Sequence, residues 1–300
     1  MKLYVSLFIS IFAAAILAAY PTSAKTFSEM FPQYQDMEPD LIVALEKLDY
    51  QQGEITVGRN LATFNISEGY YFLSPKDANT VLVEFWGNPE SDAPLGMIFP
   101  ADITPFHGDG WGLEITFDDI GYVSDDDAAD YDYDDLLVQM RKDLVDENIW
   151  RGENGYDSIA LVGWAETPAY DVTARKLYWA KELSFEGSDG NTLNYNIRAL
   201  GRKGVLVMNF IAPIEALDEV RASIPDVLAM SSFTDGNRYA DFNPSLDKVA
   251  AVGIGGLIAG KVIAKTGLLI LLLAFLKKGA IIILLPIIWL VNKLRGKGKS

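Results

Sequence analysis

The residues best suited to recognising a ligand lie along one expected strand, Thr192–Leu200. Asn194, Asn196 and Arg198 alternate along this strand, so their side chains share one of its faces. Arg202 follows in the next turn. Amide and guanidinium donors grouped in this way could clamp a carboxylate or a phosphate. In an acidic domain the same arginines could equally pair with carboxylates of the chain itself, and the sequence leaves both readings open.

A dense acidic run centred on Asp125, Asp126 and Asp127 is the second candidate site. Ca²⁺ and Mg²⁺ are hard cations that take several carboxylate oxygens from loops of this kind. The run lacks the glycine and the distal glutamate that an EF-hand loop requires at fixed positions. Helix capping is the alternative, because Ser124 precedes the three acids and a helix is expected around Tyr133–Asn148. We therefore expect no cofactor, with Ca²⁺ or Mg²⁺ at these three aspartates as the alternative.

The rest of the composition removes most familiar catalytic machinery. The 300 residues include no cysteine and one histidine, which excludes disulfide scaffolds, thiol nucleophiles and multi-histidine metal sites. The sequence contains no GxSxG elbow and no Walker loop. Its 41 acidic residues leave a carboxylate pair for hydrolysis open, although spacing alone cannot show that two of them face one another. The net charge of −16 argues against nucleic acid as a partner.

The elements expected to position these residues are those of an α+β domain. Runs of strands are interrupted by separate helices, and Gly187–Gly190 forms a clear hairpin turn between two strands. We predict an antiparallel sheet, or sheets, with packed helices in one exported domain, followed by a C-terminal transmembrane helical segment. The main expected strands are 54–57, 61–66, 96–99, 112–117, 158–166, 176–185, 192–200 and 204–211, and the main expected helices are 38–48, 74–86, 133–148 and 214–230.

Charge is strongly segregated along the chain. All 41 acidic residues lie in residues 25–248 together with 16 basic residues, which gives this body a net charge of −25. Residues 249–300 carry eight basic residues and no acidic residue. An acidic body between two apolar, basic ends is the pattern of an exported domain that is anchored in a membrane.

The N-terminus has the form of a secretory signal over residues 1–24. Lys2 supplies a basic start, Leu3–Ala19 is apolar, and Thr22–Ala24 is a small-residue cleavage site. An uncleaved N-terminal anchor is the alternative. Cleavage is favoured because Pro21 interrupts the apolar helix next to the site where a peptidase would act. Either way, residues 25–248 are expected to lie outside the cytoplasm.

The C-terminus has the form of a single membrane crossing over residues 266–291. Its apolar residues include Leu268, Leu271, Phe275, Ile281, Leu284 and Trp289. The tail, 292–300, carries Lys293, Arg295, Lys297 and Lys299, and such clusters stay on the cytoplasmic side. A two-span hairpin is the alternative. The preceding segment, 249–265, is expected to be a Gly/Ala-rich juxtamembrane helix, and its Gly256 and Gly260 have a spacing that is also compatible with a homodimer.

Several unusual stretches together resemble one bacterial family of uncharacterised membrane-anchored proteins, called domain of unknown function 2167. These stretches are Glu84–Pro89, Gly121–Ala128, Gly163–Asp171, Leu193–Arg202 and Gly236–Phe242. The resemblance extends from about Gly53 to Lys265. It implies an exported domain with a C-terminal membrane anchor, and it supplies no catalytic residues. The final strands and the helix that ends at Ser231–Phe233 also resemble sheet-and-helix domains of the photosystem-protein type, which is an analogy of fold alone.

These observations lead to one expected function and two alternatives. We expect a single-pass protein of the bacterial inner membrane whose periplasmic domain is a binding or envelope-organising module rather than an enzyme. Its expected partners are the lipid bilayer and another envelope or membrane protein. The first alternative is a carboxylate-dependent hydrolase of envelope material, with or without a divalent cation. The second is an accessory subunit of a membrane complex.

Overall fold

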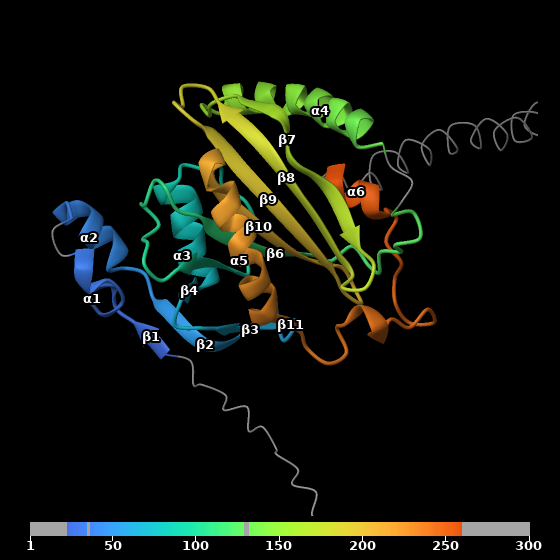
Figure 1. Ribbon diagram of the computed structural model, residues 1–300, viewed down its shortest axis with the longest axis horizontal. Coiled ribbons are helices and arrows are strands. Elements are labelled where there is room, and N and C mark those ends of the chain that lie inside the picture. Colours follow the sequence, from blue (N-terminus) through green and yellow to red (C-terminus); the bar gives the residue numbers. More distant parts are fainter. Residues whose placement is uncertain (1–22, 35–36, 129–131, 260–300) are drawn as a thin grey trace, which may run out of the picture.

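The computed structural model describes residues 23–34, 37–128 and 132–259, and its central feature is one antiparallel sheet (Figure 1). The strand order across this part of the chain is β11-β3-β2-β4-β5-β6-β10-β9-β8-β7, with β1 paired to β2. The strands are β1 Ser23–Lys25, β2 Tyr50–Val57, β3 Ala62–Ile66, β4 Tyr70–Leu73, β5 Gly96–Pro100, β6 Gly112–Asp118, β7 Ile159–Asp171, β8 Lys176–Phe185, β9 Asn191–Leu200, β10 Val205–Pro213 and β11 Ser231–Phe233. The expected α+β class with an antiparallel sheet is confirmed.

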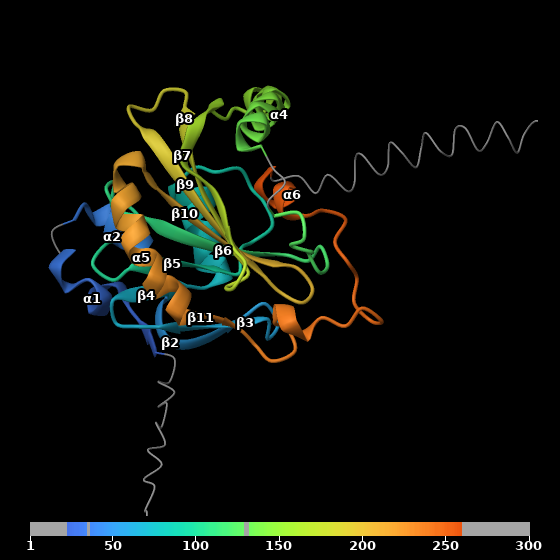
Figure 2. The ribbon, with the colours of Figure 1, turned by 45° about the vertical axis from the view of Figure 1, so that its right-hand side comes forward.

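Helices cover both faces of the sheet (Figure 2). They are α1 Phe27–Met30, α2 Pro39–Leu45, α3 Pro75–Asn79, α4 Tyr133–Glu153, α5 Leu217–Met230 and α6 Ile254–Ala259. A π-helical turn, Thr80–Phe85, continues α3, and a 3₁₀ turn, Ile214–Ala216, precedes α5. Two further 3₁₀ turns lie at Pro32–Tyr34 and Tyr239–Asp241.

Strand alternation divides the apolar residues between the two faces. Ile98 of β5 faces the large core beneath α5, where Val220 and Val227 are buried. Its neighbours Met97 and Phe99 face the opposite side and belong to a second core with α1, α2 and α3. A third core joins the far end of that same side to α6. The α3 end and the α4–α6 end therefore share one face of the sheet, and none of the described helices covers the stretch between them.

Helix α4 is attached to the sheet chiefly by polar contacts. Met140 and Arg151 are its buried residues, and its polar and apolar residues are not segregated to opposite sides. The Asn148 amide pairs with both backbone groups of Ile159, donating to the carbonyl at 2.8 Å and accepting from the N–H at 2.8 Å. Arg141 donates to the carbonyls of Leu161 and Val162. These side chains satisfy the outer edge of β7, which has no neighbouring strand in the described sheet.

The cap of α4 differs from the sequence expectation. Asp132 is the N-cap, and its Oδ1 accepts from the backbone N–H groups of Asp134 and Asp135 at 2.9 and 3.1 Å. Asp127 instead accepts from the N–H of Ile254 at the start of α6, at 3.2 Å. The expectation that residues 124–127 cap the helix at Tyr133 was wrong because a loop separates them from that helix, and a cap must directly precede the first turn.

The described part of the chain begins near the predicted cleavage site and ends inside the predicted juxtamembrane segment, 249–265. Strand β1 pairs Ser23 with Gln52, so the predicted cleavage site at Ala24 falls within a strand. Helix α6, inside the predicted juxtamembrane segment, buries Ile254, Leu257 and Ile258 against the domain. Within the described residues, every helix is too short or too polar to cross a membrane. The predicted anchor, 266–291, the tail, 292–300, and residues 1–22 of the signal lie outside those residues.

Candidate functional site

A group of polar side chains occupies the sheet face between the α3 end and α4. Strand register places Asn209 of β10 opposite both Glu114 of β6 and Asn196 of β9. Lys181 of β8 lies opposite Asn194. Directly paired residues of an antiparallel sheet point to the same side, so these side chains form one layer. We call this layer the polar floor; its members are Glu114, Lys181, Asn194, Asn196, Arg198 and Asn209.

Hydrogen bonding within the polar floor is incomplete. Asn196 donates to the side-chain and backbone oxygens of Asn194 at 2.9 and 3.1 Å. Asn209 donates to Glu114 Oε2 at 3.4 Å. Asn209 Oδ1 and Arg198 Nη1 are buried with no hydrogen-bond partner in the described structure. Buried polar atoms without partners are rare and costly, so this layer has capacity for a further polar group.

The charges of the polar floor are perturbed by burial. The Arg198 guanidinium lies 5.1 Å from the ring centroid of Trp179, and burial lowers its pKa to about 10, opposed by the negative charges of Asp118 and Glu114. Burial, reinforced by the positive charge of Arg198, lowers the pKa of the Lys181 ammonium to about 8. Burial also raises the pKa of the Glu114 carboxyl. Each shift has the sign expected for a charge removed from water.

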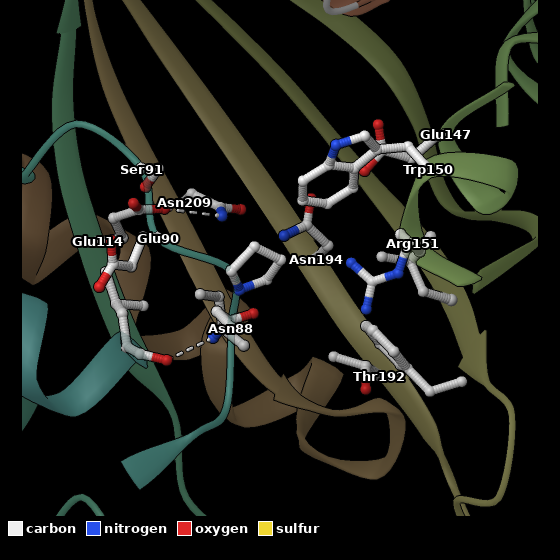
Figure 3. Close-up of a pocket in the computed structure, with 15 residues that line it drawn as sticks. Asn88, Glu90, Ser91, Glu114, Glu147, Trp150, Arg151, Thr192, Asn194 and Asn209 are labelled. Atoms are coloured by element: carbon white, nitrogen blue, oxygen red, sulfur yellow. Dashed lines mark hydrogen bonds between the residues drawn. The ribbon is translucent and has the colours of Figure 1, made fainter. Parts of the chain in front are cut away.

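The polar floor opens into a cleft of about 530 Å³ (Figure 3). Figure 3 shows Trp150 and Arg151 of α4 on one side of this cleft, Glu90 and Ser91 on the other, and Asn194 between them. The full lining is Leu82, Asn88, Pro89, Glu90, Ser91, Glu114, Glu147, Trp150, Arg151, Leu183, Phe185, Thr192, Asn194, Asn209 and Ile211. Three carboxyl groups and one guanidinium therefore face the cleft, which disfavours an anionic ligand.

Two residues at the α4 wall give the cleft its shape. Trp150 is 44% exposed and stacks on Tyr156, with ring centroids 5.9 Å apart and an interplanar angle of 12°. Arg151 is buried and donates to the carbonyl of Asp157 at 2.6 Å. Trp150 thus offers a fixed apolar ring beside polar groups, an arrangement suited to a ligand with both apolar and hydroxyl-bearing faces.

A second cavity of about 430 Å³ lies beneath α4, on the other side of Glu147 and Leu183, which line both spaces. Lys181 faces this cavity. The remaining lining is Met140, Asp143, Leu144, Ile159, Leu161 and Ala259. Asn194, Asn209 and Glu114 of the polar floor thus line the first cleft, and Lys181 lines the second cavity.

The structure separates the four residues of the predicted ligand set. Asn194, Asn196 and Arg198 share one face of β9, as the alternation indicates. Arg202 lies elsewhere and forms a two-point ion pair with Asp247, with Nε to Oδ2 at 2.7 Å and Nη2 to Oδ1 at 3.0 Å. Its Nη1 donates to the carbonyl of Gly236. Arg202 therefore binds the segment that follows β11. It does not lie beside Asn194, where a ligand would be.

The three predicted metal-ligating aspartates also have separate surroundings. Asp125 accepts from Tyr170 and Tyr239 and pairs with Arg175, and these interactions lower its pKa despite partial burial. The carboxylate of Asp126 accepts from the hydroxyl of Ser124 at 2.7 Å, while Asp127 caps α6. Among the residues that the structure describes, no group of three or more His, Cys, Asp or Glu side chains is placed to hold a metal ion.

Four residues of this region were missed by sequence reasoning: Glu114, Lys181, Asn209 and Trp150. Asn209 carried a usable signal, because it is the one polar residue in the apolar run Val205–Ala212. A polar residue inside a buried strand requires a partner, and a partner implies a polar layer. Glu114 and Trp150 join the site only through strand register and helix placement, which local sequence does not encode.

The fold and cleft define this protein as an antiparallel α+β domain with a polar, acidic cleft on one sheet face. The chain belongs to the family described as protein of unknown function (DUF2167), whose model matches residues 49–288. The resemblance of the sequence to this family is thereby confirmed. No curated protein sequence matches the chain. Among solved structures it is similar to the cyanobacterial PsbP (CyanoP) solution structure from Synechocystis sp. PCC 6803, at 11% identity and a TM-score of 0.35, over 60% of this chain and 91% of that one.

Proposed function

We propose that this protein is a membrane-anchored, exported binding module whose cleft captures an uncharged oligosaccharide of the cell envelope. The observation that carries the proposal is the polar floor beneath the cleft. Its Asn194, Asn209 and Glu114 side chains line the cleft, so amide and carboxyl groups face the ligand. Sugar hydroxyl groups both donate and accept, so they can satisfy mixed amide and carboxyl groups of this kind.

The charge and aromatic content of the cleft support a neutral ligand. Glu90, Glu114 and Glu147 outnumber Arg151 on its walls, which favours a neutral ligand over a phosphate or a carboxylate. Trp150 supplies an apolar platform for the carbon face of a sugar ring. A clamp for anions, which the sequence of β9 alone had suggested, is therefore the less suitable function for this cleft.

Export and anchoring remain part of the proposal and are supported by the charge pattern of the sequence. The acidic body, the apolar segment 266–291 and the basic tail 292–300 together favour one crossing with the tail in the cytoplasm. Anchoring would raise the concentration of the cleft near its ligand at the membrane surface. The test is a reporter enzyme that is active only outside the cytoplasm, fused after Ser300. Activity of this fusion would contradict the single crossing.

Binding is tested with the full chain in detergent micelles, with chitotetraose as the probe. We expect saturable quenching or enhancement of tryptophan fluorescence in the wild type. Asn194→Ala and Trp150→Ala should each weaken binding by about tenfold or more, which corresponds to about 1.4 kcal/mol. Val145→Ala is the matched control, because Val145 is exposed on α4 but does not line the cleft. Unchanged affinity in both cleft variants, or no saturable binding by the wild type, would refute the proposal.

A carboxylate-dependent hydrolase is the second candidate, and one observation favours it. Glu114 lines the cleft with a pKa raised by burial, as in a general acid, and Glu90 and Glu147 line the same cleft. The same probe discriminates between the two functions. If the protein is a hydrolase, mass spectrometry should detect shortened sugars after incubation with the wild type but not with Glu114→Gln. Intact chitotetraose recovered after prolonged incubation supports the binding module.

A further inference from the structure

The second cavity contains an amine in unusual surroundings. Lys181 makes no hydrogen bond or ion pair within the described part of the chain, although two carboxyl groups of α4, those of Asp143 and Glu147, line the same cavity. Most of the remaining wall is apolar, formed by Met140, Leu144 and leucine side chains of β7 and β8. A lysine in an apolar pocket without a carboxylate partner is poorly stabilised as an ammonium ion.

The neighbouring strand increases this effect. Arg198 of β9 is cationic and partly buried, and its positive charge acts with burial to lower the pKa of Lys181 to about 8. At pH 7.5 about a quarter of the Lys181 side chains would be neutral, compared with about a thousandth for an ordinary lysine. Desolvation and an adjacent cation are the two environments that activate lysine as a nucleophile.

We propose that Lys181 forms a covalent imine with a small aldehyde or ketone that enters the cavity beneath α4. The lone pair of the neutral Nζ attacks the carbonyl carbon, and a proton passes from nitrogen to the carbonyl oxygen to give a carbinolamine. The C–O bond then breaks, water leaves, and the nitrogen forms a double bond to carbon. Asp143 and Glu147 are the carboxyl groups of this cavity that could relay the proton. The step is a condensation, so it needs no oxidant or reductant.

The walls of the cavity define the class of carbonyl compound. Met140, Leu144, Leu161 and Leu183 contact the space around the amine, which favours an alkyl chain of a few carbons. The volume of about 430 Å³ accommodates such a ligand without displacement of α4. This inference is independent of the oligosaccharide proposal, because Lys181 does not line the neighbouring cleft.

Reductive trapping tests the inference on the full chain in detergent micelles. The protein is incubated with butanal and cyanoborohydride at pH 7.5, and the alkylated lysines are mapped by mass spectrometry. We expect Lys181 to be labelled at least about tenfold faster than Lys142, which is exposed on α4 and serves as the internal control. The selectivity should disappear in 8 M urea, because unfolding returns Lys181 to water.

The pH dependence of labelling and the variant Arg198→Met test whether a lowered pKa of Lys181 causes the selective labelling. The labelling rate of Lys181 should rise with pH and level off above about pH 8, whereas that of Lys142 should continue to rise. Arg198→Met should slow labelling of Lys181 at pH 7.5, because removal of the adjacent cation raises its pKa. Lys181 and Lys142 labelled at equal rates in the folded wild type would overturn the proposal, and so would a Lys181 rate without the levelling near pH 8.

Discussion

Asn148 makes the contact that most directly holds α4 on the edge of the sheet. Its side chain forms two hydrogen bonds of 2.8 Å with the backbone of Ile159, one as donor and one as acceptor. Each contributes about 1 kcal/mol net, so their removal by Asn148→Ala costs about 2 kcal/mol. Alanine is the better helix former by about 0.6 kcal/mol, which offsets part of the loss. The expected net destabilisation is about 1.4 kcal/mol, a tenfold change in the unfolding equilibrium.

The assay is urea unfolding of the full chain in detergent micelles, followed by hydrogen exchange of peptides that cover Ile159. Gln139→Ala is the matched control, because Gln139 is an amide on the same helix with one exposed hydrogen bond, to Asp143. It should change stability by less than about 0.5 kcal/mol, since exposed pairs along a helix contribute that little. A loss below about 0.5 kcal/mol in Asn148→Ala, with unchanged exchange at Ile159, would refute the edge-capping role of Asn148.

Three further predictions concern single carboxylates. Glu114→Gln should stabilise the fold at pH 7, because the raised pKa of Glu114 means that its ionised form is disfavoured in the folded state. The gain in stability over the wild type should shrink as the pH falls and Glu114 becomes protonated. Urea unfolding midpoints measured over a range of pH would show this. Asp132→Ala should destabilise α4 by about 1 kcal/mol, and an unchanged unfolding midpoint would contradict its role as N-cap. Arg202 lowers the pKa of Asp247, so the ion pair stabilises the fold above the ordinary pKa of an aspartate. This stabilisation is lost as the pH falls through the lowered pKa. In Asp247→Asn, the free energy of unfolding should therefore decrease less at acid pH than it does in the wild type.

Much of the fold could be predicted because its strands carry local signals. Alternating or continuous apolar runs located β8 and β9 almost to the residue, and the turn at Gly187–Gly190 fixed their hairpin. The expected start of a helix at residue 74 is confirmed, since Ser74 is the N-cap of α3 and its hydroxyl accepts from the N–H of Asp77 at 3.3 Å. Local propensity sufficed in these places because the decisive partners lie within a few residues of one another.

The candidate site could be predicted only in part, because it is assembled across strands distant in sequence. The alternation of Asn194, Asn196 and Arg198 placed three members of the polar floor on one face. Their neighbours Glu114 and Lys181 depend on strand order and register, which a single sequence does not specify. Arg202 was grouped with the three because it is close in sequence, yet a turn after β9 directs it to Asp247.

The order of the strands has a consequence for how this chain is made. Strands β1–β6 form one side of the sheet and β7–β10 the other, and the two sides meet where Thr116 of β6 pairs with Val207 of β10. During synthesis the first half therefore carries an open edge until nearly the whole second half has emerged. Strand β11 then returns to pair Ser231 with Phe64, far back in the first half. Such distant pairings slow folding and lengthen the time for which unpaired strands are vulnerable to aggregation. A chain cut after β6 would be an unfinished sheet rather than a smaller domain.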